Sequence, residues 1–416
     1  MVNDKIKKLH IVLVSRELGI YSWTGGIGTY VWDLARWLVK QGHECTVICS
    51  SYHPQKRWDE VREGVRIISL PDEQLLNKSP ITYPFTFKKH FLAYRKRVAD
   101  TLDKLIDSKE VDLVEFPEYG VESYIWQKRP RRIPMVVRWH TSIGRQVKIH
   151  DIIYYPLKRW MRKEVIKSIY ASDAVSFNSL WTARKLEKNI NFKRLFYTTI
   201  PYGVNYSEWF VHTMFKNEEA KKGLHLVYVG SLGARKGFTD LINAVKILRE
   251  EGFPIILTLI GKHTGYSRAY LWKENKAIIE GWLRVLGAVS REHLGRYYAS
   301  ADVCCFPSRF EAFGIVCLEA MASGGIVIGS ANSGMAEAIE DGYDGFLAPP
   351  KAPRELALII KRALHLSQEE KREMRQRARE KIREKFDNEI IASQVIDFYH
   401  CVIDNFSRGL GRIYSG

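Results

Sequence analysis

The feature that most constrains this chain is an alternation of short apolar runs with amphipathic helical segments, and this alternation occurs twice. In the first half the strand-like runs are 9–14, 44–50, 111–116, 133–140 and 173–179, and a helical pattern covers 29–42. In the second half the strand-like runs are 224–230, 255–261, 301–307, 324–330 and 345–350, and a helical pattern covers 238–252. Buried strands separated by helices favour a parallel sheet with helices on both faces. The pattern therefore predicts two doubly wound, Rossmann-like α/β domains that face a central cleft.

The change from one domain to the next is placed near "PYGVNYSEWF", residues 201–210. The predicted limits are 1–204 for an N-terminal domain, 205–385 for a second domain, and 386–416 for a C-terminal helix that packs back on the first domain. A chain of 416 residues is long enough for two such domains. Ligands of open α/β sheets bind beyond the carboxyl ends of the strands, so candidate site residues are sought directly after strands.

Positive charge is concentrated in the first half of the chain. Residues 1–200 hold 35 Lys and Arg against 21 Asp and Glu, which gives +14 of the total net charge of +17. This excess predicts an anionic partner, either a membrane surface, a phosphorylated acceptor or nucleic acid, with solubilising surface charge as the alternative. The segment 149–170 mixes aromatic and basic residues, which favours peripheral contact with an anionic membrane; a helix that buries its aromatic residues against the sheet is the alternative.

The cysteines and the N-terminus bear on the compartment. No two of the six cysteines form a C-x-x-C pair and most lie in apolar runs, so buried thiols in a reducing compartment are expected rather than zinc ligands. The apolar run at 9–14 is too short for a signal-peptide core. No apolar stretch is long enough to span a bilayer. We therefore expect a cytoplasmic protein, in contact with the inner face of the cytoplasmic membrane if it is peripheral.

Two segments of the first half carry candidate site residues. Gly25, Gly26 and Gly28 precede a helix in "TGGIGTYVWDL", where glycines let the backbone approach a ligand and the helix N-terminus favours an anion; a flexible turn is the alternative. His140 follows the strand-like run "VVRW", on the ligand side of the expected sheet. A structural histidine is the alternative there.

A cationic loop follows the first strand of the second half. Arg235 and Lys236 lie in "VGSLGARKGFTDL", between that strand and a helix. Two cations beside the free amides of a helix start suit a diphosphate, and an exposed basic turn is the alternative.

Two carboxylates occur in the mostly apolar stretch "PSRFEAFGIVCLEAMASG", residues 307–324. A carboxylate can accept hydrogen bonds from neighbouring hydroxyls, so Glu311 and Glu319 could bind a sugar and a ribose. A helix beginning near Phe313 would offer its free amides to a phosphate between them. The three features together describe a nucleotide sugar, while two surface glutamates on a helix are the alternative.

The E-x7-E pattern after "PS" and before "LEAMASG" resembles the signature of retaining glycosyltransferases of family 4, which have the GT-B fold. The similarity spans nearly the whole chain. The matching segments are "GGIGTYVWDLARWLVKQGHECTVI", "VGSLGARKGFTDLINAV", "LGAVSREHLGRYYASADVCCFPS" and "SGMAEAIEDGYDGFLAPP".

The resemblance implies a role for each matching residue. Lys236 would bind the donor diphosphate, Glu311 would lie near the hydroxyls of the donor sugar, and Glu319 would contact the ribose. His140 would lie near the transferring carbon, and Gly26 would face the phosphates or the acceptor. The backbone amides that would hold sugar and phosphate belong to Phe313, Gly314, Ile315 and Val316. The nucleobase would lie against the backbone at 287–290, which includes Val289.

Two positions depart from the family pattern. Ser231 stands where the family usually has an arginine, so Arg235 is expected to supply the missing charge, or donor affinity is lower. Ser333 stands where a glycine is usual, which predicts a different path of that loop against the donor.

The resemblance also implies the reaction. A sugar would move from a nucleotide-diphosphate sugar to an acceptor hydroxyl with retention at the anomeric carbon, in cell-envelope polysaccharide or glycolipid synthesis. The acceptor would be a sugar or a lipid-linked sugar. Protein cations would stabilise the departing diphosphate, so no metal or other cofactor is expected. A nucleotide-sugar epimerase of the same fold and a non-catalytic relative are the alternatives, and nucleic-acid binding explains the charge but not these motifs.

Overall fold

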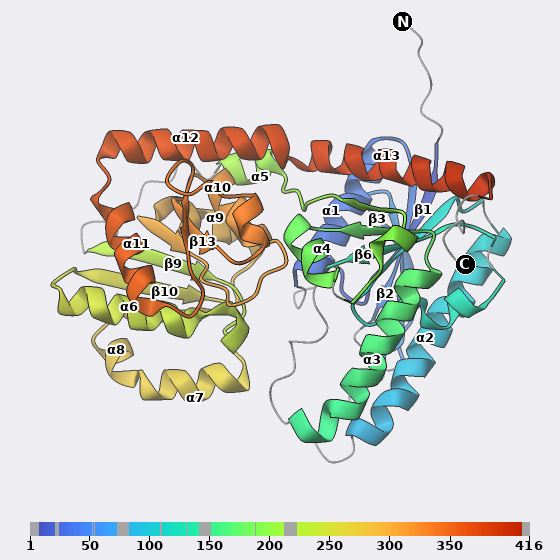
Figure 1. The fold of residues 1–416 in the computed structure, drawn as a ribbon, viewed down its shortest axis with the longest axis horizontal. Coiled ribbons are helices and arrows are strands. Elements are labelled where there is room, and N and C mark those ends of the chain that lie inside the picture. Colours follow the sequence, from blue (N-terminus) through green and yellow to red (C-terminus); the bar gives the residue numbers. More distant parts are fainter. Residues whose placement is uncertain are drawn as a thin grey trace, which may run out of the picture. The chain divides into compact units, whose positions relative to one another are not determined.

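The computed structural model describes residues 8–20, 25–51, 53, 55–72, 83–108, 110–130, 132–140, 151–187, 189–211 and 223–409. The chain forms two compact units (Figure 1). Unit 1 comprises residues 1–178, 182–200 and 392–416, and unit 2 comprises residues 179–181 and 201–391. The assignment of acceptor and donor binding to separate domains stays a prediction.

Unit 1 contains an eight-stranded sheet in the order β3-β4-β2-β1-β5-β6-β7-β8. Its strands are β1 His10–Val14, β2 Glu44–Ser50, β3 Trp58–Arg62, β4 Val65–Leu70, β5 Leu113–Pro117, β6 Met135–Trp139, β7 Ala174–Phe177 and β8 Tyr197–Thr199. All paired strands are parallel except β3, which forms an antiparallel hairpin with β4. Its turn residues Glu63 and Gly64 both have positive φ, as a tight two-residue hairpin requires. The helices of this unit include α1 Gly26–Lys40, α2 Tyr83–Ser108 and α3 Asp151–Ala171.

Unit 2 contains a six-stranded parallel sheet in the order β11-β10-β9-β12-β13-β14. Its strands are β9 Leu224–Val229, β10 Ile255–Ile260, β11 Leu283–Gly287, β12 Val303–Cys305, β13 Val327–Ser330 and β14 Phe346–Ala348. Its helices are α5 Tyr206–Phe210, α6 Phe238–Glu250, α7 Gly265–Lys273, α8 Asn275–Ile279, α9 Arg291–Ser300, α10 Ile315–Ala322, α11 Pro353–His365 and α12 Gln368–Lys385. The strand order reverses between β9 and β12, which is the topological switch point of a doubly wound sheet.

The two remaining helices have residues in both units. They are α4 Leu180–Leu186 and α13 Asn388–Ser407. From Ala392 onward α13 belongs to unit 1.

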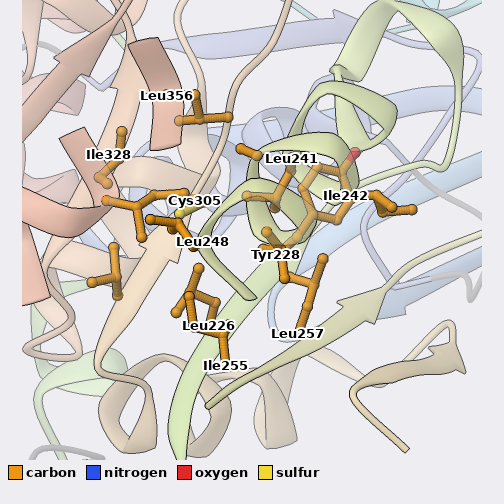
Figure 2. Packing of buried hydrophobic residues seen from close by; sticks show 14 of the residues in the cluster. Leu226, Tyr228, Leu241, Ile242, Leu248, Ile255, Leu257, Cys305, Ile328 and Leu356 are labelled. Atoms are coloured by element: carbon orange, nitrogen blue, oxygen red, sulfur yellow. The ribbon is translucent and has the colours of Figure 1, made fainter. Parts of the chain in front are cut away.

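Apolar packing explains why these segments fold as they do. In unit 2, Leu226 and Tyr228 of β9 meet Leu241 of α6 and Leu356 of α11 in one buried cluster (Figure 2). Alternate residues of a strand point to opposite faces, so a strand that is apolar on both faces needs helices on each side. The prediction of two doubly wound α/β domains is confirmed.

The same polar contact ties the first strand of each sheet to its neighbours. The histidine backbone amide donates to an aspartate at 2.7 Å in both units, and histidine Nε2 lies 2.9 Å from a threonine hydroxyl in unit 1 and 2.8 Å in unit 2. The residues are His10, Asp112 and Thr46 in unit 1 and His225, Asp302 and Thr258 in unit 2. These contacts join neighbouring strands near their amino ends. They therefore stabilise each sheet at the end opposite the loops that follow its strands.

Two expectations about the whole chain concern cysteines and membrane spans. All six cysteines are free, and five are buried as predicted, but Cys401 on α13 is exposed. Among the helices of the described ranges, none is both long and apolar enough to cross a bilayer.

Candidate functional site

Two loops meet at the switch point of unit 2. The loop after β9 ends in a short 3₁₀ turn, Ala234–Lys236, and the loop after β12 carries Glu311. The ammonium of Lys236 donates a hydrogen bond to Oε2 of Glu311, and Nη1 of Arg235 lies 3.6 Å from the same oxygen. The sequence-predicted cations and the first predicted carboxylate are therefore brought together.

Hydrogen bonds to backbone carbonyls hold these two loops together. The backbone amide of Arg309 donates to the carbonyl of Arg235 at 2.8 Å, and Nη1 of Arg235 donates to the carbonyl of Phe310 at 2.9 Å. Gly237 follows with φ of +72°, and a Cβ there would lie 1.9 Å from the carbonyl oxygen of Pro307. Only glycine permits this conformation and this approach, so it fixes where Lys236 can lie.

Arg309 and Asp240 form a second link that the sequence analysis missed. Nη2 and Nε of Arg309 donate to the two carboxylate oxygens of Asp240 at 2.7 and 2.9 Å. Such a bidentate pair fixes both position and orientation. It joins the loop after β12 to the first turn of α6. The sequence signals were an arginine within residues 307–324 and an acid at the start of the helical pattern 238–252.

Two opposing effects act on the pKa of Glu311. Burial raises the pKa of this carboxyl. The charges of Lys236 and then Arg235, with hydrogen bonds from the Lys236 ammonium and the Ala312 backbone, outweigh burial and hold the pKa of Glu311 below its usual value. Glu311 is therefore an anion flanked by two cations, and it presents acceptor oxygens only.

Glu319 has different partners from Glu311. It lies in α10, and its Oε2 accepts a hydrogen bond from the Tyr298 hydroxyl at 3.2 Å. Nε of Arg291, the first residue of α9, lies 3.7 Å from Oε1. Glu319 is only 6% exposed, so the alternative of a surface glutamate is wrong for this residue.

The helix that carries Glu319 begins slightly later than expected. Gly314 precedes α10 with φ of +96°, and the first helical residue is Ile315 rather than a residue near Phe313. The ring of Phe313 is buried against Tyr202 and Phe386, so this residue can offer a ligand its backbone but not its side chain. Gly314 thus forms the turn between the loop that carries Glu311 and the start of α10.

The other predicted donor-site residues lie on the same unit. Val316 is half-buried on the first turn of α10, and Val289 is half-buried in the loop between β11 and α9. The Ser333 hydroxyl donates to the carbonyl of Ser330 at 2.7 Å and accepts from the amide of Met335 at 3.2 Å. The ligand roles of these residues stay predictions.

Gly26 and His140 lie in unit 1. Gly26 is the first residue of α1, and the amide of the preceding Gly25 donates to Oε2 of Glu17 at 2.8 Å. Thr24, the first residue of the glycine-rich segment, lies outside the described residues.

His140 directly follows β6 and is 3% exposed. Its amide donates to Oε2 of Glu118 at 2.7 Å, and its carbonyl accepts from Nδ2 of Asn178 at 3.1 Å. The Tyr30 ring lies edge-on, 5.3 Å between centroids. Burial first, and then the charge of Arg138, lower the pKa of His140 well below 6.5. His140 is therefore a neutral imidazole at neutral pH. The residues 141–144 that follow it in the predicted motif lie outside the described residues.

This neutral histidine predicts a pH dependence of stability. The unfolded chain takes up a proton at position 140 near pH 6.5, whereas the folded chain does so only at lower pH. The free energy of unfolding should therefore fall as the pH drops below that value, by up to about 1.4 kcal/mol per pH unit from this residue. Urea unfolding at pH 7, 6 and 5 should show a shallower fall for His140→Gln than for the unchanged chain. If the free energy of unfolding falls equally with pH in both proteins, His140 is not buried as a neutral imidazole.

The helix α3 holds the basic aromatic segment. Its Trp160 packs against Phe91 at 5.0 Å between ring centroids, whereas Arg159, Arg162 and Lys163 are exposed. Trp160 thus follows the alternative and packs within the unit, but Tyr170 near the end of the helix is 42% exposed and faces outward with the basic residues. The side chains at 151–158 lie outside the described part of this helix.

Comparison with known families and proteins gives matches over most of the chain. Residues 24–208 match the family model described as Glycosyltransferase Family 4, and residues 212–384 match the one described as Glycosyl transferases group 1. An uncharacterized glycosyltransferase of Methanocaldococcus jannaschii is 26% identical over 410 residues, covering 92% of this chain and 96% of that protein. Glycogen synthase of Mycobacterium tuberculosis is 25% identical over 408 residues, covering 90% and 91%. Phosphatidyl-myo-inositol mannosyltransferase of Mycolicibacterium smegmatis is 25% identical over 329 residues, covering 78% and 77%.

Solved structures share the architecture. Sucrose-phosphate synthase from Thermosynechococcus elongatus matches with a TM-score of 0.79 at 22% identity, covering 95% of this chain and all of that one. HepE of Anabaena, in complex with UDP and glucose, matches with a TM-score of 0.67 at 16% identity, covering 94% and 100%. At these identities the likeness concerns the fold.

Proposed function

Since this chain belongs to the group 1 glycosyltransferases and has the GT-B fold, we propose that it moves a sugar from a nucleotide-diphosphate sugar to an acceptor hydroxyl with retention at the anomeric carbon. The observation that carries this proposal is the convergence of Lys236 and Arg235 on Glu311 at the switch point of unit 2. The complex of the neighbour HepE with UDP and glucose supports a donor of this class.

The charges of this cluster suit a nucleotide sugar. A diphosphate needs cations, and Lys236 and Arg235 can exchange the Glu311 carboxylate for phosphate oxygens. Glu311 then accepts hydrogen bonds from sugar hydroxyls. Glu319, buried beside α9, is the proposed acceptor for the ribose hydroxyls.

The proposed reaction breaks the bond between the anomeric carbon and the diphosphate oxygen and forms a bond to the acceptor oxygen on the same face. The acceptor proton passes to the departing diphosphate. Lys236, Arg235 and the amides at the start of α10 stabilise the charge that develops on the leaving group. Because these groups supply the positive charge, no metal is required in this proposal. His140, a neutral imidazole, is the proposed hydrogen-bond partner of the donor sugar near the reacting carbon.

We further propose a lipid-linked or saccharide acceptor of the cell envelope, reached at the inner face of the cytoplasmic membrane. The mannosyltransferase of Mycolicibacterium smegmatis, whose name specifies a phosphatidyl-myo-inositol acceptor, supports this class. The exposed Arg159, Arg162 and Lys163 on α3 would face anionic lipid.

A donor screen tests this function. Melting temperatures are measured with a panel of nucleotide sugars in excess EDTA, since a ligand well above its Kd raises the melting temperature by several degrees. The stabilising donor is then incubated with a membrane lipid extract, and the product anomer is determined by NMR. We expect one donor to raise the melting temperature, and we expect its sugar to be transferred with the anomeric configuration retained. Release of an epimeric sugar without acceptor would indicate the epimerase alternative, and binding without turnover the non-catalytic one.

A further inference from the structure

Glu115 is a carboxylate buried in the middle of the unit 1 sheet. It lies in β5 among apolar residues and is 3% exposed. Burying a carboxylate is costly unless it accepts hydrogen bonds. The Tyr399 hydroxyl donates to Oε2 at 2.8 Å, and the Tyr30 hydroxyl donates to Oε1 at 3.4 Å. One phenol from α13 and one from α1 therefore converge on the same carboxylate.

Tyr30 extends this contact to the candidate site. Its ring lies 4.6 Å from the guanidinium carbon of Arg138 and 5.3 Å from the His140 ring. Arg138 in β6 and His140 directly after it thus both lie against the Tyr30 ring. Arg138 is itself held by hydrogen bonds to the Ser176 hydroxyl and the Ile200 carbonyl, each at 2.7 Å. The hydrogen bond from the Tyr30 hydroxyl to Glu115 thus helps to position the Tyr30 ring against His140.

We propose that Tyr399 and Glu115 are positioning residues for His140, acting through the ring of Tyr30. The proposal rests on the role proposed above for His140. It makes α13 a contributor to the unit 1 site, although Tyr399 lies 259 residues after His140 in sequence. The backbone of His140 is held by Glu118 and Asn178, and the ring of Tyr30 lies against its imidazole.

The protonation states agree with this arrangement. Burial, and next the charge of Glu115, raise the pKa of Tyr399 well above its usual value, so the phenol keeps the proton that it donates. Burial raises the pKa of Glu115. The charge of Arg138 and the hydrogen bonds from Tyr399 and Tyr30 lower it, but by less than burial raises it.

Tyr399→Phe tests the proposal because it removes one hydroxyl and keeps the ring. We expect kcat to fall about 10-fold with a much smaller change in the donor KM, since His140 is proposed to contact the donor near the reacting carbon while the proposed diphosphate and ribose contacts belong to unit 2. We also expect the His140 ring resonances, assigned by comparison with His140→Gln, to shift. Tyr94→Phe is the matched control. Tyr94 is equally buried in unit 1, and its hydroxyl forms no hydrogen bond with the described residues, so it should change neither quantity.

The NMR measurement needs no substrate, so it distinguishes failure of this inference from failure of the proposed function. If Tyr399→Phe only lowers the melting temperature, and kcat and the His140 resonances are unchanged, the contact is structural and the inference is overturned. If Tyr399→Phe does not fold, Tyr30→Phe provides the same test. The lost hydrogen bond is longer there, and the same shift of the His140 resonances is expected.

Discussion

Replacing Lys236 with alanine is expected to lower kcat/KM for the donor by about 100-fold or more, the largest kinetic effect that we predict. Loss of one charged partner of a buried, hydrogen-bonded pair costs about 2–5 kcal/mol in binding, and 2.7 kcal/mol corresponds to about 100-fold. The side chain of Lys236 is 19% exposed, so solvent only partly replaces it. The variant also leaves Glu311 with one cation fewer. Steady-state kinetics with the donor found by the screen give the measurement.

Lys246→Ala is the matched control for this prediction. Lys246 pairs with Glu274 at 2.7 Å in the same unit, but on α6 rather than in the loops at the switch point. It should leave kcat/KM within about 2-fold, because a partly exposed ion pair contributes little. Similar losses in both variants would mean that Lys236 acts only through general stability.

Gly237→Ala is expected to give the largest combined loss of stability and donor affinity. A side chain at φ of +72° costs about 1–2 kcal/mol, and displacement of the backbone that it meets costs about 1–3 kcal/mol more. The contacted atom is the Pro307 carbonyl oxygen, which the new Cβ would approach to 1.9 Å. The loop of Lys236 and the loop of Glu311 must therefore separate. We expect urea unfolding to show a loss of about 3 kcal/mol, and we expect donor stabilisation in the thermal screen to disappear.

Gly252→Ala separates backbone strain from this steric contact. Gly252 has φ of +91° and nothing within 4 Å of the added Cβ. It should show the strain alone, about 1–2 kcal/mol, with donor binding unchanged. If Gly237→Ala behaves like Gly252→Ala in both measurements, the close approach of the two loops is not required for the site.

The sequence predicted the strands that build the centre of each sheet, because their residues are apolar on both faces. It did not predict β3 and β4, although "EGVRIISL" combines a Glu-Gly turn with a β-branched run. β3 is mostly exposed and charged, so periodicity gives it little signal. The short strand β8 also lacks a buried pattern, and its register depends on β7. The edge strand β11 of unit 2 was not predicted either, and the loop that follows it carries Val289. None of the missed strands carries Arg235, Lys236, Glu311 or Glu319.

The candidate site was predicted where chemistry is local in sequence. Arg235 and Lys236 lie in the loop after β9, and Glu311 lies in the loop after β12. Because β9 and β12 are neighbours in the sheet, these two loops lie side by side. Arg309 with Asp240 and Glu115 with Tyr399 were not predicted, because no motif pointed to these residues as site residues. A buried acid in an apolar strand, as in "LVEFP", was the available signal for Glu115, but its partner could come only from the structure.

We propose that Lys236, Arg235 and Glu311 form the diphosphate site for a nucleotide sugar and that this site binds without a metal ion. Calorimetric titration of the full chain with ADP, GDP and UDP in excess EDTA tests it most directly. We expect at least one nucleoside diphosphate to bind with a micromolar Kd. Lys236→Ala should weaken this binding by about 100-fold, and Lys246→Ala should leave it unchanged. Binding that requires added Mg²⁺, or that survives Lys236→Ala at full strength, would contradict it.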